Sequence, residues 1–158
     1  MNTIRFRLGA VGAPLLAAAV LAFTAPALRA QAPASPVGLW KNIDDETKQP
    51  KALIRITEKE GVISGKIEKI LTEKTDAVCD KCTADRKDQP VQGMTIVSGI
   101  RKNADQPDLF DGGSILDPNN GKVYRSQMRL TDGGKKLEVR GYIGLPLLGR
   151  TQTWLREE

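Results

Sequence analysis

The chain of 158 residues contains no histidine and only two cysteines. Without an imidazole, Ser-His-Asp and Cys-His nucleophile pairs are excluded, and so are most catalytic zinc sites. Aromatic side chains are scarce as well, with two Trp, two Tyr and three Phe. So few rings argue against a wide stacking surface for sugars or nucleotide bases. The residue types therefore indicate no enzyme class, and we expect no catalytic residue, no cofactor and no metal ion.

The net charge of +5 comes from 24 Lys and Arg against 19 Asp and Glu. Three arginines lie in the first thirty residues, which contain no acid, so 21 basic and 19 acidic residues remain after residue 30, a net charge of +2. These lysines and arginines are scattered among the acids rather than gathered in a stripe. Since phosphate neutralisation supplies most of the affinity of a nucleic-acid binder, we expect no nucleic-acid partner.

Residues 1–30 have the pattern of a secretory signal peptide. Two arginines precede an apolar stretch over residues 8–23, and small residues follow it, with cleavage expected after Ala30 or, as alternatives, after Ala27 or Ala34. An uncleaved membrane anchor is less favoured because Gly12 and Pro14 interrupt the short stretch. We predict export to the periplasm, no membrane span in the mature chain, a Pro/Ala linker at residues 31–36 and one domain at residues 37–158.

Hydrophobic side chains alternate with polar ones through almost the whole of that domain, which predicts β-strands. Tight turns rich in Gly, Asp and Asn separate the strands, and no segment has helical spacing. After a first strand that begins near Gly38, the expected strands cover residues 53–57, 62–68, 94–100, 109–116, 122–130, 136–143 and 150–156. The sequence thus predicts an all-β fold, an antiparallel up-and-down barrel of about eight strands, with an open sandwich as the alternative.

Alternation also predicts which face each side chain occupies. It places Ser98 on the same face as Ile100, and Ile143 on the same face as Val139.

The last strand carries unusual polar residues. If Trp154 points into the barrel, then alternation sends Arg150, Gln152 and Arg156 inward with it. Buried polar groups need partners, and we expect Arg156 to stack on Trp40 as a cation–π contact at one barrel end.

Arg150 and Gln152 are then candidates for a binding site, with Trp154, Tyr124 and Asn42 beside them. A guanidinium next to an amide suits bidentate capture of a carboxylate or another oxyanion. The alternative is that Arg150 pairs with an acid of its own chain, such as Asp117 or Glu68.

Two loops have sequence features that predict their roles. Cys79 and Cys82 are separated by two residues, and in an exported protein we expect a structural disulfide rather than a redox pair or half of a zinc site. The apolar loop at residues 144–149 either plugs one end of the barrel, which we favour, or forms an apolar rim for a ligand or partner.

Several motifs in order carry a family resemblance. Gly38-Leu39-Trp40, with Arg156 as the partner of the Trp, resembles the opening of lipocalin barrels. Together with Cys79-x-x-Cys82 and the segments at residues 112–118, 121–124, 140–144 and 149–154, it is similar to a family of small secreted bacterial proteins, domain of unknown function 2147. The resemblance implies a lipocalin-like barrel in the cell envelope and brings no established activity. The chain lacks the Thr-Asp-Tyr type motif and the C-terminal helix of true lipocalins, which argues against a large apolar pocket.

These observations favour a binding protein over an enzyme. We predict noncovalent binding of a small amphipathic or anionic molecule at one mouth of the barrel. The alternative is an envelope interaction module that uses its outer surface on a partner protein and holds no small ligand.

Overall fold

The computed structural model describes residues 35–158. The predicted signal peptide, its proposed cleavage sites and nearly all of the linker lie outside the described residues. The domain is all-β, with short 3-10 turns at Ala84–Arg86, Asp132–Gly134 and Pro146–Leu148. Its strands are β1 (Gly38–Ile43), β2 (Pro50–Lys59), β3 (Val62–Ile70), β4 (Thr95–Lys102), β5 (Leu109–Asp117), β6 (Lys122–Thr131), β7 (Lys136–Tyr142) and β8 (Arg150–Arg156).

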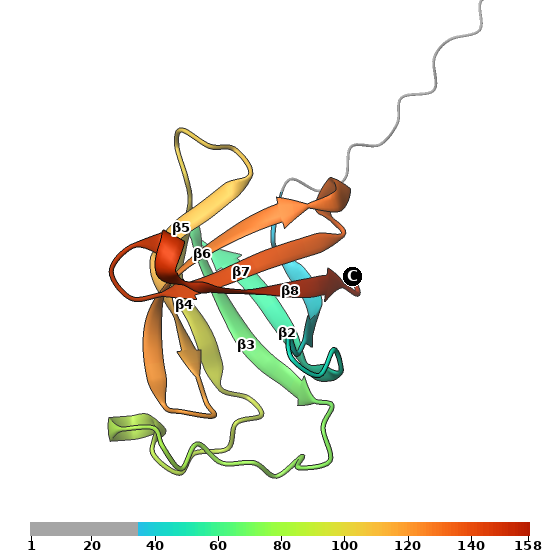
Figure 1. Cartoon of the computed structure of the whole chain (residues 1–158), viewed down its shortest axis with the longest axis vertical. Helices are drawn as coiled ribbons and strands as arrows, with labels where there is room; N and C mark the ends of the chain where they lie inside the picture. Colours follow the sequence, from blue (N-terminus) through green and yellow to red (C-terminus); the bar gives the residue numbers. More distant parts are fainter. Residues whose placement is uncertain (1–34) are drawn as a thin grey trace, which may run out of the picture.

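The eight strands form a closed antiparallel barrel in sequence order (Figure 1). Each strand pairs with the next, and β8 pairs with β1 to complete the ring, with Trp40 opposite Arg156 and Asn42 opposite Trp154. Closure leaves no edge strand for pairing with other chains. The predicted barrel is confirmed, and the open sandwich is excluded.

One half of the barrel is packed with large side chains. The tryptophan of β1 lies there, fully buried, at the end where the described chain begins and where it stops. Around it the strands contribute aliphatic and sulfur-containing side chains that are also buried: Ile56, Ile63, Ile100, Phe110, Met128 and Leu137. Burying such residues removes apolar surface from water, which stabilises this half of the barrel.

Strict alternation fails in β4. Ile96 and Val97 are both buried although they are consecutive, whereas Ser98 is exposed. The pairing of β3 with β4 shifts register around Gly65, and Gly99 has a φ of +75°. Such an irregularity reverses the faces of the residues that follow it. The expected inward position of Ser98 is therefore wrong, and Val97 takes its place in the core.

The end of β7 also differs from expectation. The strand stops at Tyr142, so Ile143 lies in the following loop with 71% of its surface exposed rather than on the core face with Val139.

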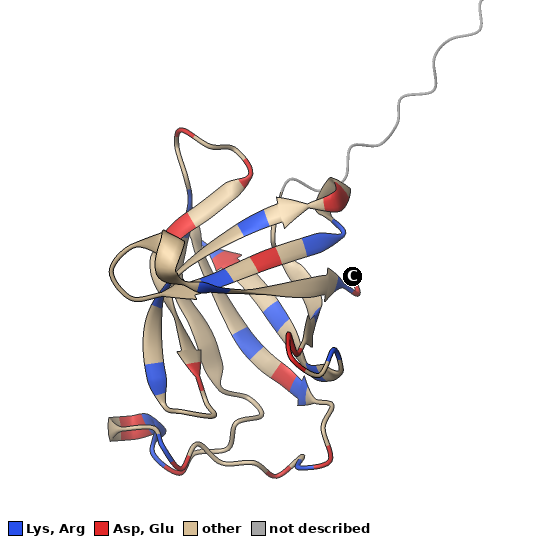
Figure 2. Cartoon of the chain, in the orientation of Figure 1, with Lys and Arg blue, Asp and Glu red and all other residues tan. Residues whose placement is uncertain are grey.

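Charged side chains of both signs are distributed over the strands and loops, and the view in Figure 2 shows no basic stripe on the described residues. Within residues 35–158, no helix has the length and apolar character needed to span a membrane.

Candidate functional site

The other half of the barrel is hollow. A cavity of about 650 Å³ lies between the strands and opens at the end formed by four loops, at residues 44–49, 71–94, 118–121 and 143–149. We call this opening the mouth. The volume falls in the range of small-molecule pockets. The departures from the lipocalin pattern argued against a large apolar pocket, and the cavity that the structure shows is lined by both aliphatic and polar side chains.

Most of the cavity wall is aliphatic. The strands β2 to β5 and β7 supply Ile54, Ile67, Ile70, Ile96, Ile115, Leu116 and Val139 to it. The hollow exists because small residues also point inward here, among them Ala52 on β2 and Gly141 on β7. Small residues at inward positions near the mouth, Ala52 and Gly141, are the sequence signal of this cavity, which the motifs alone do not reveal.

A pair of side-chain amides interrupts the aliphatic wall on β1 and β8. Asn42, which is 7% exposed, donates from Nδ2 to Oε1 of Gln152 at 3.0 Å, and both residues line the cavity. Trp154 lies beside them, and its indole N–H has no hydrogen-bond partner among the described residues. Tyr124 also lines the cavity, and its hydroxyl accepts a hydrogen bond from the Asn120 amide at 3.1 Å. Four of the predicted ligand-binding residues thus border one cavity, and their role in binding stays a prediction.

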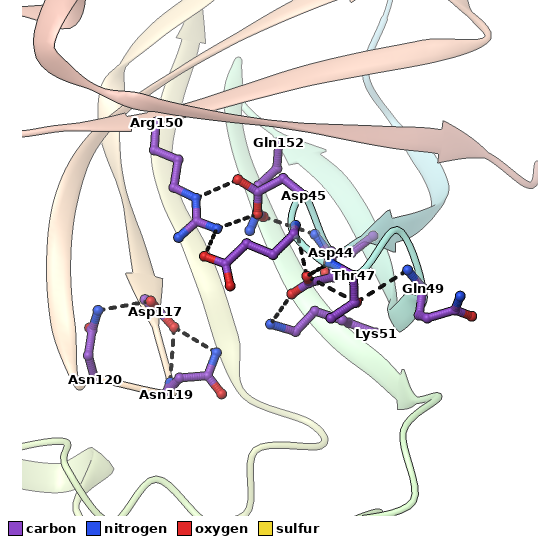
Figure 3. Close-up of polar contacts among 12 residues, drawn as sticks. Asp44, Asp45, Thr47, Gln49, Lys51, Asp117, Asn119, Asn120, Arg150 and Gln152 are labelled. Atoms are coloured by element: carbon purple, nitrogen blue, oxygen red, sulfur yellow. Dashed lines mark hydrogen bonds and ion pairs between the residues drawn. The ribbon is translucent and has the colours of Figure 1, made fainter.

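The fifth, Arg150, lies at the mouth rather than inside the barrel. Its side chain is 59% exposed and points to the β1–β2 loop, where Nη2 donates to Asp45 at 2.6 Å and to Glu46 at 3.0 Å (Figure 3). Its partners are therefore acids of its own chain, but not the two that were named from the sequence. Asp117 accepts from neighbouring amides in its own turn, and Glu68 pairs with Arg55.

The β1–β2 loop is ordered by Asp44, which brings the acids to Arg150. The Asp44 carboxylate accepts hydrogen bonds from the backbone N–H groups of Thr47 and Glu46 and forms a salt bridge with Lys51 (Figure 3). These contacts hold the pKa of Asp44 well below its usual range. The Arg150 guanidinium likewise lowers the pKa of Asp45. An acid followed three residues later by Thr was the sequence sign of this turn.

Arg156 closes the packed end. Its guanidinium carbon lies 4.2 Å from the centre of the Trp40 ring, the stacking expected from the sequence. The guanidinium also donates to the carbonyl oxygens of Ser35, Val37 and Gly134 at 2.7 to 2.9 Å. One side chain therefore ties the chain leading into β1 to β8 and to the β6–β7 turn. Burial lowers the pKa of Arg156.

The long β3–β4 loop carries the disulfide. Cys79 and Cys82 are bonded, as predicted, and both are buried, at 0% and 4% exposure. The loop packs closely on the β5–β6 turn, since a Cβ on Gly121 would lie 1.9 Å from the Lys81 carbonyl oxygen. Burial shields the sulfurs from attack by another thiol, which fits a structural bond that fixes one side of the mouth.

The β7–β8 loop does not plug the barrel. Leu145, Leu147 and Leu148 are 67%, 84% and 79% exposed, so the expectation of a plug is wrong. Arg140 holds this loop in place, because its guanidinium donates to the Leu147 carbonyl at 3.0 Å and to the Thr151 hydroxyl at 2.6 Å. The result is an ordered apolar rim on one side of the mouth, of which Leu148 and Ile143 line the cavity.

Comparison with known proteins agrees with this geometry. A family model described as an uncharacterized protein conserved in bacteria, DUF2147, matches residues 38–156, from the first residue of β1 to the last of β8. The chain belongs to the DUF2147 family. No curated protein matches it.

The DUF2147 barrel resembles a solved lipocalin structure. Protein HP1028 from the human pathogen Helicobacter pylori, described as belonging to the lipocalin family, superposes with a TM-score of 0.68 at 16% identity, over 78% of this chain and 84% of that one. This likeness establishes a lipocalin-like fold, and function must be argued from the site itself.

The cavity of this DUF2147 protein is lined by aliphatic side chains and a pair of side-chain amides, with charged residues at its mouth. Among residues 35–158, no cluster of three or more Cys, Asp or Glu is arranged to hold a metal ion. An aliphatic wall with a few fixed polar groups can hold a small molecule by burial and orient it by hydrogen bonds.

Proposed function

We propose that this DUF2147 protein is exported to the periplasm and binds a small amphipathic molecule noncovalently in the hollow half of its barrel. The observation that carries the proposal is the 650 Å³ cavity, which is aliphatic along most of its wall and polar at its mouth. A ligand whose apolar part enters the cavity would exchange water contact for burial, while its polar part stays at the amides or the rim.

The rim supports an amphipathic ligand better than a purely anionic one. The positive charge of Arg150 is already matched by two carboxylates, and that of Lys51 by Asp44 at 3.1 Å. An anion that binds Arg150 or Lys51 would have to displace these acids, and the third cation of the lining, Lys74, is exposed to water in the β3–β4 loop. Binding energy therefore comes mainly from the aliphatic wall.

The proposal is tested with N-phenyl-1-naphthylamine, an uncharged dye that fluoresces in apolar surroundings. We expect saturable binding at one dye per chain, accompanied by a change in the fluorescence of Trp154. Ala52→Phe places a ring inside the cavity and should weaken dye binding at least tenfold, whereas Ala104→Phe, on an exposed loop at the packed end, should leave it unchanged. Equal binding by wild type and Ala52→Phe, with both folded by circular dichroism, would place the dye elsewhere and refute the proposal.

Export rests on the N-terminal sequence pattern and is tested separately. We expect the protein in the periplasmic fraction, with an intact mass that corresponds to cleavage after Ala30. Recovery of the uncleaved chain from the cytoplasm would overturn this part of the proposal and leave ligand binding untouched.

A second candidate function is interaction with another protein through the apolar rim, because three leucines stand exposed on an ordered loop. Exposed aliphatic groups that cluster are typical of interaction surfaces. Under this alternative, sedimentation should show concentration-dependent association that Leu147→Ser and Leu148→Ser abolish together. A monomer at all concentrations, with dye binding intact, favours the small-ligand function.

A further inference from the structure

The side-chain amides of Asn42 and Gln152 on the cavity wall indicate which polar group a ligand would carry. This inference rests on the proposed function. Each side-chain amide has an NH2 group that donates and a carbonyl oxygen that accepts. The single hydrogen bond between Asn42 and Gln152 uses one NH2 group and one oxygen. One NH2 group and one oxygen of the pair are therefore left over, with no other side-chain partner among the described residues.

This conclusion does not depend on how either amide is oriented. If both amides are turned over, the bond runs from Gln152 to Asn42, and again one donor group and one acceptor remain. The leftover atoms are also not sealed in the wall, since the buried side-chain atoms without partners are Ser126 Oγ and Trp154 Nε1 only, within residues 35–158. Both residues line the cavity, which is thus the space these atoms can reach.

Among the described residues, no hydrogen bond or salt bridge joins a charged side chain to the pair. Five charged residues contribute to the cavity lining, and all lie at the mouth or in its loops: Lys51, Lys74, Asp80, Asp117 and Arg150. A carboxylate at the amide pair would lose hydration, and the cation two positions away on β8, Arg150, is already paired with Asp45 and Glu46, which makes such binding unfavourable. A purely aliphatic group there would leave the amides without partners.

We infer that the ligand places an uncharged group that both donates and accepts hydrogen bonds, a primary amide or a hydroxyl, against Asn42 and Gln152. These two residues then determine specificity, by rewarding a matched polar group and rejecting a carboxylate. The rest of the ligand lies along the isoleucines of β2 to β4.

The test compares three ligands of equal chain length by displacement of N-phenyl-1-naphthylamine at pH 8: decanamide, N,N-dimethyldecanamide and decanoate. Dimethylation removes the donors but adds apolar surface, so an undiscriminating cavity would prefer the dimethyl compound. We expect decanamide to bind about tenfold more tightly than N,N-dimethyldecanamide, and decanoate to bind most weakly.

The variant Gln152→Leu should reduce the tenfold preference to threefold or less. Gln127→Leu is the matched control, because Gln127 is half-buried on β6, two strands away from β8, and does not line the cavity. In wild-type protein, the side-chain amide NMR signals of Gln152 should shift on addition of decanamide, which tests the contact without a mutation.

The outcomes separate the two proposals. An absence of saturable dye binding overturns the proposed function. Three outcomes with normal dye binding overturn only the inference about the amide pair. Decanoate is the tightest ligand, or Gln152→Leu leaves the preference for decanamide over N,N-dimethyldecanamide unchanged, or none of the three compounds displaces the dye.

Discussion

Replacing Arg156 by Ala removes the side chain that ties together the packed end of the barrel. The lost contacts are the stacking on Trp40 at 4.2 Å and hydrogen bonds to four backbone oxygens, three of them at 2.7 to 2.9 Å and that of Glu158 at 3.3 Å. A cation–π contact contributes about 0.5 to 2 kcal/mol, and a hydrogen bond to a charged donor about 1.5 to 3 kcal/mol. Because Arg156 is partly exposed, water can reach some of the freed carbonyls, and we expect a total loss of about 3 kcal/mol rather than the full sum.

Urea unfolding followed by circular dichroism measures this loss. With a slope near 2 kcal/mol per molar urea, the midpoint should fall by about 1.5 M with the slope unchanged. Arg156→Lys keeps the charge over the ring but cannot reach three carbonyls, so it should fall between wild type and Arg156→Ala. The control Arg129→Ala removes an exposed pair with Asp108 and should leave the midpoint in place. A midpoint for Arg156→Ala within about 0.2 M of wild type would refute the reasoning.

Three further predictions concern the mouth. In urea unfolding, Gly144→Ala should lower the free energy of unfolding by roughly 1 kcal/mol, because an alanine at a positive φ is strained and nothing else lies near the new methyl group. Gly121→Ala should lower it at least twice as much, because its methyl group would also collide with the β3–β4 loop. Equal losses would contradict the close packing of that loop. Replacing both cysteines of the disulfide by serine should cost about 2 kcal/mol, from closure of a four-residue ring, and retain the far-ultraviolet circular dichroism of the barrel; loss of that spectrum would show that the bond holds the fold. Because Arg150 lowers the folded-state pKa of Asp45, this pair stabilises the protein above about pH 4 and loses its effect as the pH falls further. In Arg150→Gln, an NMR titration should therefore show a higher pKa for Asp45 than in wild type, and an unchanged pKa would refute the pairing.

The barrel could be predicted from the sequence because its information is local. Alternation and turn residues placed β8 at residues 150–156 and set the first residue of β5, β6 and β7. The irregularity at Val97 and Ser98 could not be seen in the same way. It arises from the register between β3 and β4, where Gly65 lets Val97 approach closely, and this is a property of two strands together.

The site was predictable in part. Strand alternation led to Asn42, Gln152 and Trp154, which the structure brings to one wall. The salt bridges of Arg150 join residues more than a hundred positions apart, and they depend on how far β1 and the loop after it extend beside β8. Such distances follow from barrel closure, which sequence patterns do not measure.

The barrel is closely packed at the end around Trp40 and contains a cavity at the other end, and substitutions have different effects at the two ends. In a close-packed interior, trimming a side chain opens a void and destabilises the fold. The isoleucines that border the hollow half already face open space, so shortening Ile70 or Ile115 removes contacts but creates no new sealed void. Substitutions on this wall can therefore change the size of the cavity at a small cost in stability, while the packing around Trp40 stays the same.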